Sequence, residues 1–249
     1  MSIKNISCVI IVKNGASTIK ETLESLSLFD DVVLYDNGST DATLEIAKNY
    51  TNINIVMGDF LGFGETKNRA ASFAKNSWIL SLDGDEVLPP SLIEELKTLK
   101  LENEKEVFII KRDNYFLDKE IKHSGWGRDF LTRIYNKNQH GFNKNIVHEF
   151  VELKNDTIKT KLKNSFKHNA VQDINQFLQK IINYSDLASK DKKTCCFLVV
   201  LVKAKWAFIK TYFLQLGFLD GWRGFVIAMF NFNGKFFRYL KRYINARTK

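Results

Sequence analysis

Short apolar runs alternate with segments of helical spacing through the first hundred residues, and this alternation constrains the fold more than any other feature. The runs have the length and composition of strands buried inside a sheet, and we expect strands at residues 6–12, 31–35, 53–57 and 78–82. Strand–helix units in succession favour a mostly parallel sheet with right-handed crossovers. The sequence therefore predicts a doubly wound α/β fold with helices on both faces of the sheet.

Hydroxyl side chains indicate where three of the helices begin. A Ser or Thr followed three residues later by Glu is the pattern of a capping box at a helix N-terminus. The chain has two such pairs, Thr18 with Glu21 and Ser91 with Glu94, and Ser39 or Thr40 is placed to cap a helix between them. We therefore expect helices to start at these side chains.

Polar side chains end three of the four apolar runs: Lys13-Asn14, Asp36-Asn37-Gly38 and Asp83-Gly84-Asp85-Glu86. In open α/β sheets the carboxyl ends of parallel strands meet at one edge, where ligands bind. An Asp at that edge can accept a hydrogen bond from a base or a ribose. Two aspartates flanking a glycine can hold a divalent cation against a diphosphate, and Lys67 can pair with phosphate oxygens. The pattern predicts a nucleotide site with a metal; solvated polar turns are the alternative.

Two common nucleotide-binding sequences are absent. No G-x-G-x-x-G follows the first apolar run, and the chain has no Walker A sequence. Dinucleotide redox chemistry and P-loop chemistry are therefore disfavoured.

The composition is that of an ordinary globular protein, with 45% hydrophobic and 26% charged residues among 249. The three cysteines show no paired spacing, from which we expect a reducing cytosol. The N-terminus has too short an apolar stretch for a signal peptide, and the longest uninterrupted apolar run, residues 195–202, is far below the ~18 residues that span a bilayer. We therefore expect a protein that is neither secreted nor membrane-spanning.

Basic charge is concentrated at the C-terminal end. Residues 195–249 hold ten of the 37 Lys and Arg residues, one of the 28 acidic residues and 14 of the 32 aromatic residues, so this segment carries a net charge of +9 and the remainder is neutral. Interleaved basic and aromatic side chains are typical of amphipathic helices in a membrane interface, where each basic residue near an anionic surface contributes about 1 kcal/mol. We predict such a region over residues 191–249; a packed helical hairpin or a dimer interface is the alternative. Aliphatic clusters disfavour nucleic-acid binding.

Four motifs resemble, in order and spacing, the family 2 glycosyltransferases of GT-A fold, which have a Rossmann-like sheet: residues 10–14, 36–41, 67–70 and 82–86. Segments 123–126, 133–136, 147–149 and 218–225 resemble a narrower branch, the bacterial lipopolysaccharide-core β-glucosyltransferases that glycosylate heptose. Gly15 departs from the acid that is common in the family, and Asn37 from a second Asp. These departures concern recognition of the base, and neither removes the predicted metal site.

The resemblance implies an inverting transfer of a hexose, glucose in the narrower branch, from a UDP-sugar with Mg²⁺ or Mn²⁺. By motif match, Asp36 contacts the base, Val12 and Asn14 line the nucleotide pocket, Asp83 contacts the ribose or the metal, and Asp85 binds the metal. Residues 1–100 form the nucleotide-sugar half and residues 101–190 the acceptor half of one GT-A domain.

Inversion also requires a carboxylate that takes the proton from the attacking hydroxyl. We expect Glu149 in this role, with Asp129 as the second candidate. His148 is a further metal or diphosphate contact, and His123 with Trp126 forms an acceptor platform, because a Trp face suits a sugar ring. The alternative for Glu149 is an ordinary exposed acid, for His148 a structural role, and for Trp126 a place in the core.

Together these features predict a metal-dependent glycosyltransferase at the inner face of the cytoplasmic membrane, with a glycolipid acceptor. Two other hypotheses remain open at this stage. A haloacid-dehalogenase-like phosphohydrolase also has a D-x-D after an apolar strand, although there the motif normally follows the first strand. A non-catalytic membrane or nucleic-acid adaptor that retains the fold is the second.

Overall fold

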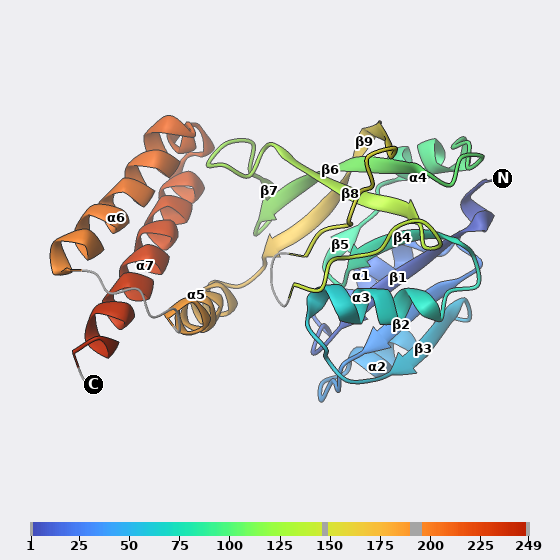
Figure 1. Cartoon of the computed structure of the whole chain (residues 1–249), viewed down its shortest axis with the longest axis horizontal. Helices are drawn as coiled ribbons and strands as arrows, with labels where there is room; N and C mark the ends of the chain where they lie inside the picture. The colour runs from blue at the N-terminus through green and yellow to red at the C-terminus, as the bar shows by residue number, and fades with distance from the viewer. Residues whose placement is uncertain (1, 146–148, 190–195, 248–249) are drawn as a thin grey trace. The chain divides into compact units, whose positions relative to one another are not determined.

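The computed structural model describes residues 2–145, 149–189 and 196–247. The chain divides into two compact units (Figure 1): the first is Met1–Arg112 with Asp129–His168, and the second is Asp113–Arg128 with Asn169–Lys249. Each unit has buried apolar clusters of its own. The change of composition near residue 191 therefore falls inside the second unit, which also takes in a segment from the middle of the chain.

Four parallel strands form one half of the first unit's sheet, in the order β3-β2-β1-β4. They are β1 (Ile6–Val12), β2 (Val32–Asp36), β3 (Ile53–Met57) and β4 (Trp78–Asp83). All four apolar runs are therefore strands, as predicted. In β1 the register places Ile10 beside Leu34 of β2 and Leu82 of β4, so the ends of these strands meet at one edge.

Helices cover both faces of this parallel half, as predicted. They are α1 (Ile19–Ser25), α2 (Thr43–Ala47), α3 (Phe63–Ser72) and α4 (Pro90–Lys97), after a short 3-10 helix, η1 (Ser2–Asn5). Alternate residues of β1 enter different apolar clusters: Ile10 packs with Leu23 of α1 and Leu92 of α4, whereas Val9 packs with Ala70 of α3. Successive side chains of a strand point to opposite faces of the sheet, and the helices packed against Ile10 and against Val9 therefore lie on opposite faces.

The other half of the sheet is antiparallel and was not anticipated. Strand β4 is followed across the sheet by β8 (Asp129–Asn136), β6 (Glu106–Phe116), β9 (Ile158–Val171) and β5 (Glu86–Val87), while β7 (Lys119–Glu120) pairs with β6. Within this half, β8 runs antiparallel to β4, and β5 pairs Glu86 with His168 of β9. The turn after β4 therefore lies beside β9.

The predicted start of α1 at Thr18 is confirmed and the other two predicted cap positions are wrong, and none of the three helices has a side-chain capping hydrogen bond. Thr18 stands at the N-cap of α1 but makes no capping hydrogen bond, Ala42 is the N-cap of α2, and Pro89 precedes α4. Thr18 instead donates to the carbonyl of Gly15 (3.3 Å). Loop hydrogen bonds and a proline at the first helical position replace the local caps.

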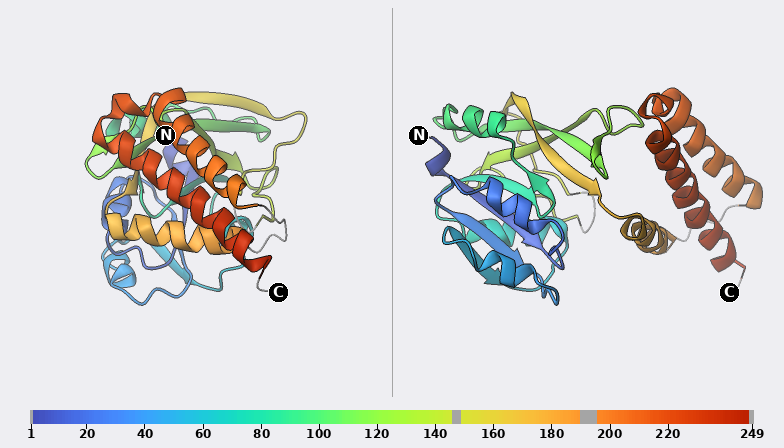
Figure 2. Two further views of the ribbon diagram at one scale, coloured as in Figure 1. Left: turned by 90° about the vertical axis from the view of Figure 1, so that its left-hand side faces the viewer. Right: turned by 180° about the vertical axis from the view of Figure 1, so that it is seen from behind.

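The second unit is largely helical: α5 (Ile174–Ser189), α6 (Phe197–Ile209), a π-helical turn η2 (Lys210–Leu214), a 3-10 turn η3 (Gly217–Asp220) and α7 (Trp222–Asn245). Helices α6 and α7 lie side by side as a hairpin (Figures 1 and 2). The hairpin turn is tight, because a Cβ on Gly224 would lie 1.8 Å from the carbonyl oxygen of Gly217. No helix among the described residues has both the length and the apolar character needed to cross a membrane.

Candidate active site

The loops that follow β1 and β2 are joined by hydrogen bonds. Asn14 adopts a left-handed backbone (φ 54°); its N–H donates to Ser39 Oγ (2.9 Å), and its Oδ1 accepts from the N–H of Thr40 (2.8 Å). Two further bonds join the same loops: Gly15 N–H to Thr43 Oγ1 (2.8 Å) and Ala16 N–H to Asp41 Oδ2 (3.0 Å). The Asn14 side chain thus builds this edge, and its contact with a nucleotide stays a prediction.

Asp36 lies fully buried at the end of β2. Its Oδ2 accepts from the N–H groups of Gly38 (2.9 Å) and Ser39 (2.8 Å), and its Oδ1 accepts from Ser39 Oγ (2.5 Å). The carbonyl of Val12, at the end of β1, accepts from Asn37 N–H (2.9 Å). Asp36 and Val12 therefore shape the turn between neighbouring strand ends, where their nucleotide contacts remain predicted.

Asp83, at the end of β4, is held by two cations. Its Oδ1 lies 2.8 Å from Lys67 Nζ, and its Oδ2 lies 3.2 Å from Arg133 Nη2. Lys67 comes from α3 and is buried; its Nζ also lies 2.8 Å from Glu149 Oε1. The structure thus brings together three residues predicted for the site. The Lys67 ammonium contacts two carboxylates, and its pairing with a phosphate stays a prediction.

Glu86 is fully buried behind Asp83. One of its oxygens accepts from the Asp83 N–H (3.0 Å), and the other pairs with Arg133 and lies 3.4 Å from Arg112 Nη1. Arg112 in turn donates through Nε to Asp129 Oδ2 (2.8 Å) and through Nη2 to the same oxygen (2.7 Å). Asp129 is therefore tied to the site through two charged neighbours.

These contacts form one chain of alternating charges, hereafter the strand-end network. Its members, in order of contact, are Glu149, Lys67, Asp83, Arg133, Glu86, Arg112 and Asp129. Both candidate bases stand at its two ends. Charges that leave water are tolerated when each has an opposite charge and hydrogen bonds beside it, and this network meets that condition.

The network changes the pKa values of Asp83, which is partly exposed, and of Glu86, which is buried. Desolvation alone would raise the pKa of the Asp83 carboxyl, but the Lys67 ammonium and the Arg133 guanidinium outweigh it, and the pKa lies well below its usual range. Desolvation dominates at Glu86 and raises the pKa of that carboxyl, although Arg133 opposes the change. The Asp83 carboxylate is therefore ionised at neutral pH and fixed in orientation.

Asp85 lies outside the strand-end network. Its Oδ2 lies 3.4 Å from His168 Nε2, because the β5–β9 pairing sets Glu86 opposite His168. Both side chains keep partial solvent access. Within residues 2–145, 149–189 and 196–247, no three His, Cys, Asp or Glu side chains gather as a metal site. The predicted ligand His148 lies outside the described residues.

The predicted acceptor residues His123 and Trp126 lie in the second unit. His123 Nδ1 is 3.2 Å from Asp220 Oδ1. The Trp126 ring meets Phe177 edge-on, with centroids 6.4 Å apart. Their assignment to the acceptor stays a prediction.

Arg112, Arg133 and His168 were given no role from the sequence. Arg133 offered a signal, since it interrupts the apolar residues of β8, where a buried charge requires a partner. Arg112 and His168 gave no comparable signal, because their partners are set by antiparallel pairing between distant segments.

The parallel strands with covering helices, the antiparallel extension and the carboxylates at the strand ends define a GT-A glycosyltransferase fold. The chain matches the family described as glycosyl transferase family 2 over residues 7–156, and it belongs to that family. Because the chain belongs to a glycosyltransferase family, the phosphohydrolase hypothesis is rejected.

The chain is similar to other glycosyltransferases, in one case over nearly its whole length. An uncharacterised glycosyltransferase of Rickettsia prowazekii is 29% identical over an alignment of 258 positions that covers 96% of this chain and 86% of that protein. The cholesterol galactosyltransferase of Borreliella burgdorferi is 26% identical over 125 residues (47% of this chain, 35% of that protein). The lipopolysaccharide core biosynthesis glycosyltransferase LpsC of Rhizobium meliloti is 29% identical over 98 residues (38% and 36%).

Among solved structures, S. aureus TarS (residues 1–349) in complex with UDP-GlcNAc superposes with a TM-score of 0.51 at 17% identity. The match covers 98% of this chain and 89% of that one. The likeness shows a shared fold.

Proposed function

We propose that the protein is an inverting glycosyltransferase that moves a hexose, glucose in the first instance, from a UDP-sugar to a glycolipid acceptor such as a lipopolysaccharide-core heptose. The observation that carries this proposal is the Asp83-Gly84-Asp85 turn at the strand-end edge of a family 2 chain, with Asp83 fixed by two cations. Support for the donor comes from TarS, which binds UDP-GlcNAc on the same fold. Partial likeness to a cholesterol galactosyltransferase and to LpsC supports a lipid-linked acceptor.

Asp85 and His168 are the residues that would hold a divalent metal. Their oxygen and nitrogen atoms face each other at 3.4 Å with partial solvent access. A carboxylate oxygen suits Mn²⁺ or Mg²⁺ beside substrate phosphates, and the imidazole, a softer ligand, favours Mn²⁺ of the two. Both oxygens of Asp83 already face cations, so Asp83 fits the ribose contact better than the metal. When bound, the metal would neutralise charge on the departing diphosphate.

Glu149 is the proposed base. It shares the Lys67 ammonium with Asp83, so its carboxylate is held beside the strand-end turn. The alternative base, Asp129, directs one oxygen at two nitrogens of Arg112. A base must stand within hydrogen-bond reach of the attacking hydroxyl, and Lys67 supplies the anchoring that such a position requires.

The second unit is proposed to associate with an anionic membrane surface, placing the protein in the cytoplasm on the inner face of the cytoplasmic membrane. Fifteen of the 27 exposed large apolar side chains in the described residues lie between Phe197 and Ile244. Soluble monomers seldom expose so many neighbouring apolar groups, and basic amphipathic helices bind interfaces through both area and charge.

The experiment that tests the proposed function measures UDP release from UDP-glucose with Mn²⁺, with and without a lipopolysaccharide-core acceptor, followed by a screen of other UDP-sugars. We expect acceptor-dependent release and a loss of about a hundredfold or more in Asp85→Asn. Asp30→Asn is the matched control, because Asp30 is an exposed acid that precedes β2. Release that is absent with every donor, or unchanged in Asp85→Asn, contradicts the proposal.

A further inference from the structure

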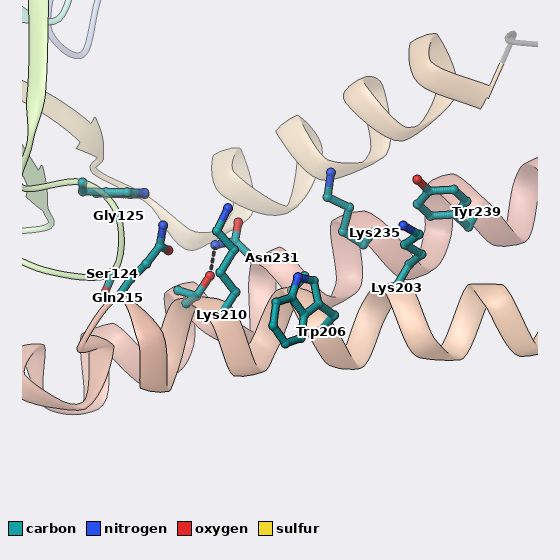
Figure 3. A pocket seen from close by; sticks show the side chains of 12 residues that line it. Ser124, Gly125, Lys203, Trp206, Lys210, Gln215, Asn231, Lys235 and Tyr239 are labelled. Carbon is teal, nitrogen blue, oxygen red and sulfur yellow. Dashed lines mark hydrogen bonds between the residues drawn. The ribbon is translucent and has the colours of Figure 1, made fainter.

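A pocket of about 510 Å³ lies in the second unit, between the α6–α7 hairpin and the loop at residues 124–126 (Figure 3). Lys203 and Trp206 of α6 and Lys210, the first residue of η2, recur at helical spacing and share one face. On α7, Asn231, Lys235 and Tyr239 do the same. The volume falls within the range of small-molecule sites.

The charge of the lining points to an anion. Three lysines, Lys203, Lys210 and Lys235, line the pocket, and its lining includes no Asp or Glu. Among the described residues none of the three lysines has an ion-pair partner. Three like charges in one concave space repel one another, and a bound anion relieves that repulsion. A phosphate group, with several acceptor oxygens, suits three ammonium donors.

The rings and amides of the lining point to a saccharide. The aromatic side chains of Trp126, Trp206 and Tyr239 combine a flat apolar face with a polar atom. Gln215 and Asn231 add amide groups that both donate and accept hydrogen bonds. An inorganic anion makes no favourable contact with an aromatic face. A sugar ring packs its C–H groups against such a face and forms hydrogen bonds between its hydroxyls and the amides.

The loop wall of this pocket is built before any ligand arrives. Asp220 is buried, and its carboxylate accepts from the N–H groups of Lys122 (3.2 Å) and His123 (3.2 Å) and from Ser124 Oγ (2.7 Å). These bonds fix the loop that carries Trp126. A fixed wall reduces the entropy lost on binding.

The opposite face of the same hairpin differs in character. There Lys205, Phe208, Ile209, Met229 and Phe232 line an apolar hollow of about 270 Å³. Lys203 and Lys205 are both exposed, are two residues apart on α6 and line different hollows. They form a matched pair for an experiment.

We propose that the pocket binds a phosphate-bearing saccharide headgroup. The binding of such a headgroup is independent of the proposed function. The further statement that this headgroup is part of the acceptor rests on the proposed function. On this basis the acceptor belongs to the class of anionic, phosphorylated glycans.

The test titrates the full-length protein with four probes and follows the indole N–H signal of Trp206 by NMR. The probes are glucose 6-phosphate, glycerol 3-phosphate for a phospholipid headgroup, glucose for an uncharged ring, and UMP for a nucleotide. We expect glucose 6-phosphate to bind at least about fivefold more tightly than each of the other three. Equal or tighter binding of glycerol 3-phosphate or UMP, or no shift of Trp206 with glucose 6-phosphate, overturns the proposal.

The variants Lys203→Gln and Lys205→Gln locate the site. We expect Lys203→Gln to raise the Kd for glucose 6-phosphate by about threefold or more, and Lys205→Gln to leave it unchanged. Equal effects of the two substitutions overturn the assignment to this pocket. UDP binding, measured in parallel by calorimetry, separates the two proposals. A protein that binds UDP but not glucose 6-phosphate contradicts this inference alone, whereas one that binds glucose 6-phosphate but not UDP contradicts the proposed donor.

Discussion

In the strand-end network of the first unit every charge faces an opposite charge, whereas the three lysines of the second unit's pocket face none among the described residues. Lys67, Glu86 and Arg133 of the network are buried, and there an unpaired charge costs several kcal/mol. The pocket is open to solvent, where ammonium groups remain hydrated. The first arrangement fixes carboxylates in position, and the second leaves cations available to a ligand.

The largest effect should follow from breaking the centre of the network. Arg133→Met leaves Glu86 buried and deprives Asp83 of one of its two cations. We expect the free energy of unfolding, from urea denaturation, to fall by about 3–5 kcal/mol. Arg69→Met is the control, since Arg69 is exposed on α3. A loss no larger than that of the control contradicts the structural role of the network.

Substitutions at the two ends of the network distinguish the candidate bases. Glu149→Gln keeps the shape of the side chain and removes its proton acceptor, so we expect kcat to fall by about a hundredfold or more. Asp129→Asn should lower kcat by less than about tenfold. Initial rates at saturating donor measure both, and the reverse order of effects assigns the base to Asp129.

In the second unit the buried Asp220 carboxylate, unlike the three lysines, has hydrogen-bond donors around it. Asp220→Asn removes the carboxylate that holds residues 122–124, and we expect a loss of about 1–3 kcal/mol in stability. Hydrogen exchange of this loop should rise at the same time. Asp118→Asn is the control, because Asp118 is exposed and pairs with Arg223 at the surface. Unchanged exchange in Asp220→Asn argues against a prebuilt wall.

The smallest effect concerns the apolar surface of α6. Leu198 and Val202 are 67% and 55% exposed, so replacing both by Ser should change the stability by less than about 0.5 kcal/mol each. Affinity for vesicles containing anionic lipid should nevertheless fall by about tenfold. Leu28→Ser, on the first unit, is the control in a co-sedimentation assay. Equal binding by the wild type and the double variant rejects α6 as the membrane contact.

The sequence predicted the parallel half of the sheet because each strand there is a local apolar run with a polar end. It also predicted that Asn14, Asp36 and Asp83 lie at one edge, since strand direction alone brings them there. Lys67 was expected to pair with phosphate oxygens; in the structure it contacts Asp83 and Glu149, and Glu149 lies 82 residues away in the chain. A motif does not reveal such a partner.

Several features missed in the sequence interpretation depend on contacts between distant segments. Ser39 was expected to cap a helix, yet its hydroxyl donates to Asp36 and accepts from Asn14. Arg112 and His168 acquire partners only through antiparallel pairing, and the second unit gathers residues 113–128 with the C-terminal helices. The Asn14–Ser39 bond and these strand pairings join residues far apart in the chain, and a local pattern does not reveal such contacts.

The bonds from Asn14, Gly15 and Ala16 to the loop after β2 have a consequence for binding thermodynamics. Two loops that are fastened to each other lose their conformational freedom when the chain folds. A nucleotide that arrives at this edge then meets a surface already in place, and its affinity is not reduced by the entropy of ordering those loops. Loosening the fastening, for example at Asn14, should therefore slow association more than it speeds release.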